Sequence, residues 1–489
     1  MMMDQIRYIA PELGLLCFAL LLVLVDLFIS NKRALPVIAV IGALVSAALA
    51  LSLWSVPAAE AFNRMIAVDQ FGLFFKLLIL SATVLVVMAS HSYVLKFDKF
   101  QGEYYALLML SAIGLMLLVS AINLITIYVA LELSSISLYV LVSFLKDKWS
   151  SEAGLKYLIL GAVASAILLY GMAFVFGLTG NTCLPCIADY VKGMPFTSLL
   201  QNPALLLGLV LIISGFGFKI ASVPFQMWVP DVYQGAPTPV TAYLSVASKA
   251  AGFAVIARIF MTAFGMPAWL HNEWAMIIAV LAAVTMTVGN LTAIVQTNVK
   301  RLLGYSSIAQ AGYLMVGLAA MGMSTEAGNV AAGGLVFFLL SYTLTNLGAF
   351  IAIIAISNKI NSDEISDYAG MIKRSPLLAL GLTVCLISLT GLPPTAGLIA
   401  KIYIFKGAID QGLLWLVIIA VINSVISAYY YFKVVKAMWL GEPASEEKVT
   451  STWPEWAALA VCCAIVVVMG ILPGAFINLT QAAVKMLGI

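Results

Sequence analysis

Apolar runs of about twenty residues recur along almost the whole chain, with short polar stretches between them. A helix of that length crosses the hydrocarbon core of a bilayer. Hydrophobic residues make up 63% of the 489 residues and charged residues only 10%, whereas an ordinary soluble domain has about 25% charged residues. The sequence therefore predicts an all-α polytopic membrane protein without a separate soluble domain.

The apolar pattern predicts 14 spans, one of them interrupted. They run over 8–29, 35–54, 71–93, 104–120, 123–145, 156–178, 204–222, 238–261, 275–296, 303–322, 331–356, 376–409 (interrupted), 412–438 and 456–478. The first run contains Pro11, Glu12 and Asp26 and is followed by no small-residue cleavage site, so we expect a retained span rather than a signal peptide.

Lysine and arginine gather in alternate loops. One set of loops holds Lys32, Arg33, Lys96, Lys99, Lys146, Lys148, Lys300, Arg301, Lys359, Lys373, Arg374, Lys433, Lys436 and Lys448. The opposite set holds only Arg7, Arg64, Lys192 and Lys485. Because basic loops face the cytoplasm, we expect both termini to lie on the outer side. Lys76, Lys156, Arg258 and Lys406 lie near span ends and are expected to snorkel to the interface.

The segment Gly215–Ser245 contains the most unusual interruption of an apolar span. It reads GFGFKIASVPFQMWVPDVYQGAPTPVTAYLS, with Lys219 before Pro224 and Lys249 shortly after the segment. Proline removes a backbone donor and clashes with the preceding turn, so one continuous helix is excluded. Irregular backbone at membrane depth must be buried in protein or line a wet cavity, and such breaks mark ion or substrate paths. We therefore interpret this segment as a site.

A second interruption, Gly391-Leu-Pro-Pro394, lies in the twelfth span and is followed by Lys401. Two broken spans, each with a lysine and five spans apart, predict two inverted five-helix repeats with broken seventh and twelfth helices. We expect an N-terminal three-helix unit (1–103), a first repeat (104–261), a second repeat (262–440) and a C-terminal helix (441–489).

Glu132 lies about nine residues into its span, or roughly 13 Å at about 1.5 Å per residue, which is near the bilayer midplane. An ion there costs at least ~2.5 kcal/mol on insertion scales. One interpretation is a protonated carboxyl bonded to a serine on the next turn. We favour a proton relay in which Glu132 pairs with Lys219, because ionisable residues inside membranes are functional by default and a coupled pair changes its proton affinity readily.

The sequence lacks the residue patterns of nucleotide-binding, haem and metal sites. No dinucleotide or P-loop motif occurs, so the chain itself should bind neither NADH nor ATP. His91 and His271 lie near span ends on opposite sides and cannot share a haem. Cys183-Leu-Pro-Cys186 has no partner motif for a metal, so a local disulfide or two free thiols is favoured. Asp69 and Asp231 are expected to cap helices or lie at an interface. We expect no cofactor, metal or nucleic acid.

Several stretches resemble one family. VPFQMWVPDVYQGAPTPVTAYLSVASKAAG, IYVALELSSISLYVLVSF, SSEAGLKYLILGAVASAILLYG, VKRLLGYSSIAQAGYLMVG and LTGLPPTAGLIAKIYIF are similar to the antiporter-like subunits of respiratory complex I and the Mrp-type antiporters. The PDVYQGAPTPV form and the lysine at 401 are closest to the subunit N type. The resemblance covers roughly residues 70 to 440.

The resemblance implies a role for each buried lysine. Glu132 and Lys219 would form the first half-channel, Lys249 the connection and Lys401 the second half-channel, with Lys156 as a further lysine of the path. It implies proton translocation in an NADH:quinone oxidoreductase of a bacterial inner membrane. NADH, FMN, iron–sulfur clusters and quinone would bind partner subunits, and an antiporter-like subunit M and small subunits such as K would be neighbours. The alternatives are an Mrp-type cation/proton antiporter subunit, a purely structural subunit and the equivalent subunit of a photosynthetic or hydrogenase-linked relative.

Two positions depart from the family. The family often has histidine where this chain has Gln226 and Gln310. Histidine relays protons near neutral pH, whereas glutamine only forms hydrogen bonds and orients water. Water or a tyrosine, Tyr305 or Tyr313, would then have to link Lys249 to Lys401.

Overall fold

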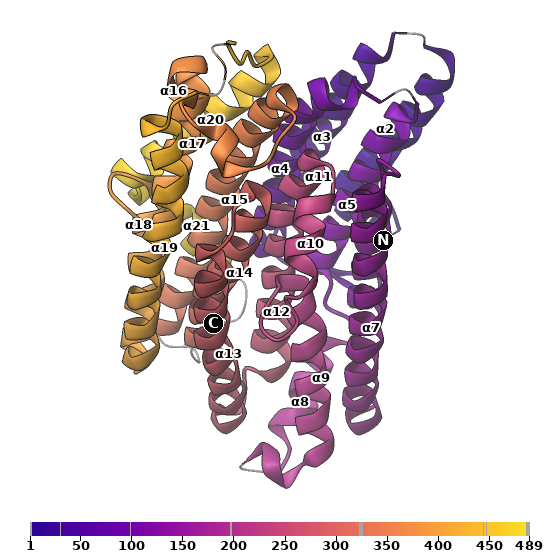
Figure 1. Ribbon diagram of the computed structural model, residues 1–489. Helices are drawn as coiled ribbons and strands as arrows, with labels where there is room; N and C mark the ends of the chain where they lie inside the picture. Colours follow the sequence, from indigo (N-terminus) through magenta and orange to yellow (C-terminus); the bar gives the residue numbers. More distant parts are fainter. Residues whose placement is uncertain are drawn as a thin grey trace.

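The computed structural model describes residues 2–29, 31–97, 99–195, 198–321, 326–443, 445 and 447–485. This part of the chain is almost entirely helical (Figure 1). The first half contains α1 (Met2–Tyr8), α2 (Ala10–Phe28), α3 (Leu35–Ser52), α4 (Gln70–Val94), α5 (Gln101–Ser120), α6 (Leu124–Val142), α7 (Lys148–Thr179), α8 (Leu184–Lys192), α9 (Pro203–Ile220), α10 (Trp228–Gly235), α11 (Thr238–Tyr243) and α12 (Lys249–Phe264). A π-helical segment, Leu244–Ser248, joins α11 to α12.

The second half repeats this style of long helices with short connections. It contains α13 (Ala268–Ile294), α14 (Val299–Ala320), α15 (Glu326–Ile360), α16 (Met371–Arg374), α17 (Pro376–Thr390), α18 (Ala396–Asp410), α19 (Leu414–Leu440), α20 (Trp453–Ile471) and α21 (Gly474–Val484). Single 3₁₀ turns lie at Lys32–Ala34, Leu199–Gln201 and Ile365–Tyr368. The strands β1 (Ala59–Ala61) and β2 (Ile66–Val68) form an antiparallel hairpin, with Ala59 opposite Val68.

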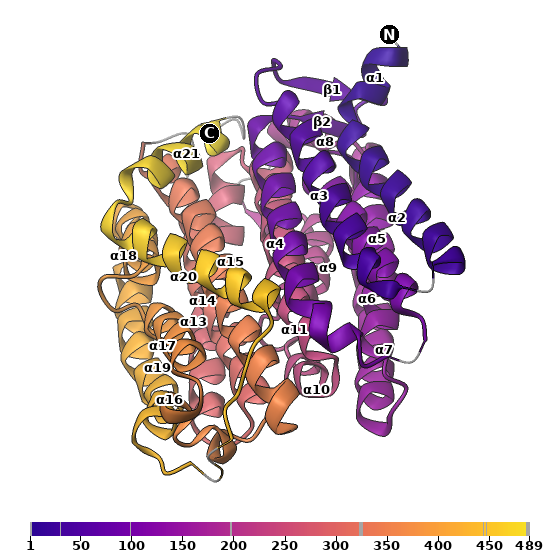
Figure 2. The same ribbon diagram turned by 90° about the horizontal axis from the view of Figure 1, so that it is seen from above.

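Thirteen helices in the described part are long and apolar enough to cross a membrane. The predicted span 376–409 consists instead of α17 and α18, each only 15 residues long. The all-α polytopic class is therefore confirmed, with the twelfth expected span divided as the proline pattern predicts. Figure 2 shows α1, the hairpin, α8 and α21 at one end of the bundle and α10 and α16 at the other, with both chain ends at the first.

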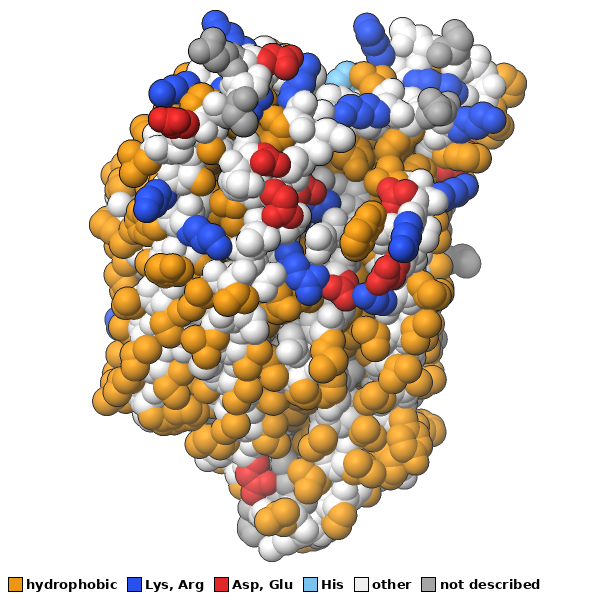
Figure 3. Space-filling view, viewed as in Figure 1, with side chains coloured by type: hydrophobic (Ala, Val, Ile, Leu, Met, Phe, Trp, Pro, Cys, Tyr) orange, Lys and Arg blue, Asp and Glu red, His pale blue; other side chains and the backbone are white. Residues whose placement is uncertain are grey.

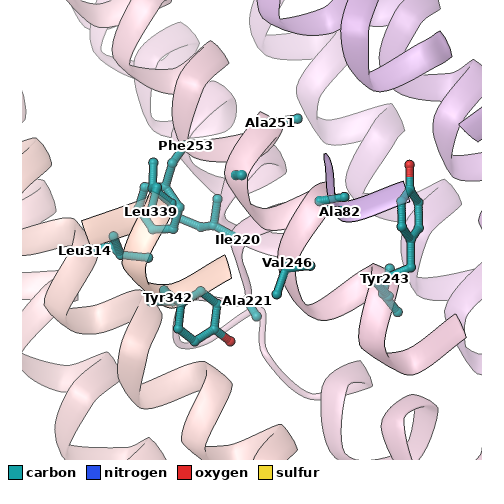
Figure 4. Close-up of a cluster of buried hydrophobic side chains, with 14 of the residues drawn as sticks. Ala82, Ile220, Ala221, Tyr243, Val246, Ala251, Phe253, Leu314, Leu339 and Tyr342 are labelled. Carbon is teal, nitrogen blue, oxygen red and sulfur yellow. The ribbon is translucent and has the colours of Figure 1, made fainter. Parts of the chain in front are cut away.

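The helices around the two breaks lie at the centre of the bundle. The apolar windows of Thr238–Phe264, Val299–Ala320 and Gly328–Ile360 are 94% buried, whereas that of Ala10–Phe28 is 28% buried. In Figure 4, Ile220 of α9, Val246 of the π-helical segment, Leu314 of α14 and Tyr342 of α15 belong to one apolar cluster. The end of α9 thus packs in a buried apolar region, whereas Pro224 in the first break and Leu392, Pro393 and Pro394 in the second are exposed.

Two cations contradict the snorkelling prediction. The side chain of Lys76 is 2% exposed, and its Nζ lies 2.8 Å from Glu12 Oε1. The side chain of Arg258 is 3% exposed and donates to both carboxylate oxygens of Asp69, at 2.7 and 2.9 Å. Asp69 also caps α4, as predicted, because its Oδ1 accepts from Gly72 N at 2.7 Å. Both cations are held inside the protein because their partners come from other helices.

Candidate functional site

Lys219 lies in the last turn of α9, directly before the first break. Helix α9 ends where Ala221 adopts a left-handed conformation, with φ +64°. The side chain of Trp228 turns back to donate to Phe218 O at 3.0 Å, which satisfies one carbonyl of the broken helix end. Lys219 is 4% exposed, and its Nζ donates to Ser135 Oγ of α6 at 3.1 Å. The break thus presents a buried ammonium to α6.

Glu132 lies on the same helix as Ser135, one turn earlier. Its carboxylate accepts a hydrogen bond from Ser165 of α7. No ion pair within 4.0 Å joins Glu132 to Lys219, so the two residues of the predicted relay are not in direct contact in this arrangement, and the relay itself stays a prediction. The nearby serine that the sequence suggested as a partner of Glu132 instead binds Lys219, and the partner of Glu132 comes from the neighbouring helix. Each of the two ionisable side chains therefore binds a serine hydroxyl: Lys219 binds Ser135, and Glu132 binds Ser165.

Lys249 begins α12, at the end of the π-helical segment. It is 3% exposed and donates to Ser307 of α14 twice, to the carbonyl oxygen and to Oγ, each at 2.5 Å. Ser307 Oγ also lies 3.0 Å from Tyr342 OH and 3.2 Å from Tyr233 OH. Three helices and the first broken span therefore converge on one serine, which the sequence did not single out.

Lys401 lies on α18, directly after the second break. It is 5% exposed, and its Nζ donates to Thr390 O at 2.7 Å and to Leu389 O at 3.4 Å. These carbonyls end α17, where the helix dipole favours a cation. The ammonium also lies 4.7 Å from the centre of the Tyr313 ring. The second break thus holds its lysine with two backbone carbonyls and the face of an aromatic ring, and no carboxylate in the described part of the chain lies within ion-pair distance.

Gln310 connects the surroundings of the two central lysines. Its Nε2 donates to Leu389 O at 3.0 Å, which is the same carbonyl that Lys401 contacts. Gln310, Tyr342 and Lys401 also line one small cavity of about 10 Å³, close to the volume that a single water needs. The hydroxyls of Ser307 and Tyr342 therefore extend from Lys249 to a cavity that Lys401 lines.

Neither tyrosine considered from the sequence lies between Lys249 and Lys401. Tyr313 packs against Lys401, as above, and its OH accepts from Asn290 at 3.1 Å. The ring of Tyr305 instead faces the guanidinium of Arg301 at 5.9 Å. Tyr342 is the tyrosine between the two lysines, and no local motif distinguishes it in the sequence. Only its contact with Ser307, 35 residues away, reveals its position.

Lys156 lies outside the buried group. Its side chain is 42% exposed, and its Nζ lies 2.8 Å from both Glu152 and Asp231. Asp231 in turn lies 2.6 Å from Arg301. These ion pairs connect α7, α10 and α14 at the end of the bundle, so the position of Lys156 near a span end is as predicted. Gln226 lies in the break, and its buried Oε1 has no hydrogen-bond partner among the described residues.

Cys183 and Cys186 are free thiols in the structure. Burial, followed by the contact with Cys186, raises the pKa of Cys183. A thiol with a raised pKa is a poor nucleophile at neutral pH. The described residues contain no group of three or more His, Cys, Asp or Glu side chains that could hold a metal ion. No disulfide joins Cys183 to Cys186 in the structure.

Gly391 gives a test of how tightly the second break is built. Its φ is +90°, and an added Cβ would lie 2.9 Å from Lys401 Cδ. Gly391→Ala should lower the free energy of unfolding by more than the ~1–2 kcal/mol that a left-handed non-glycine residue costs. Gly180→Ala is the matched control, because Gly180 has φ +66° with nothing within 4 Å. Thermal unfolding in detergent should rank Gly391→Ala below Gly180→Ala; equal losses would show that Lys401 is not confined.

Comparisons with known proteins place the chain in a family. Residues 121–427 match the family described as NADH:quinone oxidoreductase/Mrp antiporter, TM. NADH-quinone oxidoreductase subunit N of Dehalococcoides mccartyi is 48% identical over 481 residues, which cover 98% of this chain and 99% of that protein. The chain belongs to the subunit N family of NADH-quinone oxidoreductases. Subunit N of Trichlorobacter lovleyi agrees, with 42% identity over 489 residues that cover 99% of this chain and 98% of the relative.

Solved structures share the fold of this subunit N family member. A chain of respiratory complex I from Thermus thermophilus with bound Aureothin superposes with a TM-score of 0.79 at 32% identity, covering 96% of this chain and 98% of that chain. A chain of the Mrp complex from Dietzia sp. DQ12-45-1b has a TM-score of 0.84 at 18% identity, covering 100% of this chain and 98% of that one. At that identity the second likeness shows the fold alone.

Proposed function

We propose that this chain is the proton-translocating membrane subunit of an NADH:quinone oxidoreductase. The observation that carries the proposal is the central group of three lysines, Lys219, Lys249 and Lys401. Each is at most 5% exposed, and among the described residues none forms an ion pair with a carboxylate. Buried ammonium groups are costly without partners, so a purely structural subunit gives no reason for three of them. A group that gains and loses a proton needs this kind of poorly compensated site.

In this proposal Glu132 and Lys219 form the proton relay of the first half, Lys249 connects the halves and Lys401 serves the second half. Each hand-over uses groups that both donate and accept: Ser135 beside Lys219, and Ser307 with Tyr342 beside Lys249. Gln310 replaces a histidine of the family and holds Leu389 O, so it orients the path and carries no proton itself. Lys156 acts from the end of the bundle through Asp231.

The two breaks support the proposed inverted repeats, 104–261 and 262–440. Helix α9 ends in a left-handed residue, Ala221, and α17 ends in another, Gly391. In both, a side chain from beyond the break donates to the carbonyls of the broken end: Trp228 to Phe218 O, and Lys401 to Thr390 O. The segments 1–103 and 441–489 would then be additions on either side of the repeats.

We place NADH, FMN, iron–sulfur clusters and quinone in partner subunits, because this chain has no nucleotide motif. An antiporter-like subunit M and a small subunit such as K are the proposed neighbours in a bacterial inner membrane. The end of the bundle with α10 and α16 carries the basic loops and would face the cytoplasm. Figure 3 supports this orientation, since charged side chains gather toward the top of that view and the rest of the face is mostly apolar.

A comparison of driving forces separates this proposal from an antiporter. Inverted membrane vesicles that contain the complex should take up protons when NADH and a quinone are supplied. A sodium gradient without NADH should cause no proton exchange. Sodium-driven exchange together with no NADH-driven uptake would contradict the proposal and would identify the chain as an Mrp-type antiporter subunit.

A further inference from the structure

Helix α8 lies at the end of the bundle that holds both chain ends (Figure 2), and two thiols lie at its start. Cys183 directly precedes the helix, and Cys186 lies in its first turn, with Leu184 and Pro185 between them. Proline fits there at no cost in hydrogen bonds, because the first N–H groups of a helix have no partner within it. Cysteines in a Cys-X-X-Cys motif and at a helix N-terminus are often reactive.

Backbone hydrogen bonds hold the start of α8 against two other segments. Leu184 N donates to Ile122 O at 2.9 Å. Leu124 N, at the start of α6, donates to Thr182 O at 2.8 Å. Ile122 N donates to Met65 O, in the turn between β1 and β2, at 3.0 Å. The hairpin, the start of α6 and the start of α8 therefore form one junction, and the backbone sets the position of both thiols in it.

Arg64, in the same turn of the hairpin, contacts one of the thiols. Its Nη1 donates to Cys186 Sγ at 3.6 Å, and its Nε lies 3.0 Å from Glu60 Oε2. The pKa of Arg64 is raised, first by Cys186 and then by Glu60. A guanidinium beside a sulfur favours the thiolate, which is the nucleophilic form of cysteine. Cys186 therefore has the surroundings of a reactive thiol.

The two thiols differ in their access to solvent. Cys183 is 8% exposed, whereas Cys186 is half-buried. Burial, followed by Cys186, raises the pKa of Cys183. Residues three apart on a helix are neighbours, with ~5–6 Å between Cβ atoms, and a disulfide needs ~3.5–4.5 Å. A small shift within the first turn is therefore enough to join the two sulfurs, and Cys186 is the one that a reagent in solution meets first.

We propose that Cys183 and Cys186 form a redox-active dithiol that exchanges with small disulfides in solution, with Cys186 as the attacking thiol and Arg64 as the residue that positions and charges it. On the outer side of the membrane, where the proposed orientation places α8, the resulting disulfide would persist. The inference takes only this placement from the proposed function and does not depend on proton transfer through the lysines.

The exchange has two steps and balances. The Cys186 thiolate attacks one sulfur of a disulfide RSSR, and RS⁻ leaves. Cys183 then loses its proton and attacks Cys186 in the mixed disulfide, and a second RS⁻ leaves. The second attack is intramolecular, which compensates for the poor nucleophilicity of the buried thiol. The two cysteines are oxidised to a disulfide, RSSR is reduced, and the two thiol protons end on two RSH.

Purified complex in detergent, first reduced with dithiothreitol, tests this site with glutathione disulfide as the probe. Mass spectrometry of the peptide that carries both cysteines identifies the product, and rapid blocking of free thiols gives its rate of formation. Cys183→Ser and Cys186→Ser are each other's matched controls, because each leaves one thiol. Arg64→Gln removes the guanidinium, and Lys192→Gln is its control, because Lys192 is an exposed cation in the last turn of α8.

We expect the wild type to form a Cys183–Cys186 disulfide that dithiothreitol reverses. Cys183→Ser should keep a glutathione adduct on Cys186, whereas Cys186→Ser should keep a free Cys183. Arg64→Gln should react roughly 2-fold more slowly, because a smaller thiolate fraction is partly offset by a stronger nucleophile, and Lys192→Gln should match the wild type.

Two free thiols in the treated wild type, or a stable glutathione adduct on its Cys186, would overturn the dithiol. Equal adducts in the two serine variants would overturn the assignment of Cys186 as the attacking thiol. If either serine variant does not assemble, the product formed by the wild type decides. All of these outcomes leave the proposed proton translocation standing, which Lys219→Met tests separately.

Discussion

Lys401→Met should slow proton transfer through the second half of the chain by ~10²-fold or more, the usual loss when a positioned acid–base group is removed. Methionine matches the length of lysine but carries no proton. The substitution also removes the ammonium donor of Thr390 O, which costs about 1–3 kcal/mol when a buried acceptor has no other partner. Leu389 O keeps the amide of Gln310. NADH-driven proton uptake by inverted vesicles measures the effect.

Lys406→Met is the control for this substitution. Lys406 lies on the same helix, α18, but its side chain is exposed and faces away from the break. We expect wild-type uptake in Lys406→Met. If the two variants pump equally well, Lys401 is not part of the path, and its contacts with the end of α17 only stabilise the broken helix.

Arg258→Met should lower the free energy of unfolding by ~3–5 kcal/mol, because it leaves a buried carboxylate without its partner. Asp69 is 8% exposed and receives two hydrogen bonds from Arg258. The guanidinium also donates to Val119 O at 3.1 Å and so connects α12 to the end of α5. Chemical unfolding in detergent, or the yield of assembled complex, measures this loss.

The double substitution Asp69→Asn with Arg258→Met separates lost charge pairing from lost packing. The amide keeps the cap on Gly72 N but carries no charge. The double variant should therefore be more stable than Arg258→Met alone. If it is equally unstable or worse, the guanidinium stabilises the fold by packing against Phe71, which lies 5.1 Å from it, rather than by balancing charge.

The breaks and their lysines were predictable from the sequence because proline and glycine act locally. Pro224 and Pro394 interrupt a helix in almost any surroundings. Irregular backbone at membrane depth must be covered by protein, so a lysine beside such a break is expected to lie inside the protein. The glycine at 391 likewise indicates a helix end from the sequence alone, and in the structure it has the left-handed conformation that such an end requires, with φ +90°. These features gave the all-α membrane class and the places of Lys219 and Lys401 without knowledge of any distant contact.

The partners of those lysines were not predictable, because they depend on contacts between distant segments. Ser307 lies 58 residues from Lys249, and many serines in apolar helices merely bond their own backbone, as Ser81 does with Leu77 O. Position in a span likewise could not show that Lys76 is buried, since its partner Glu12 lies two helices earlier. The sequence likewise could not show which groups lie between Glu132 and Lys219. Serines from two helices take the nearby positions.

The most direct test of proton transfer through this chain is NADH-driven proton uptake by inverted vesicles that carry Lys219→Met. Lys219 is 4% exposed and held by a single serine, so the substitution removes the proton carrier with little loss of packing. We predict that fewer protons are taken up per NADH oxidised, while the complex stays assembled. Unchanged uptake in fully assembled complex would contradict the proposal and would mean that the broken helices are scaffold and protons cross elsewhere.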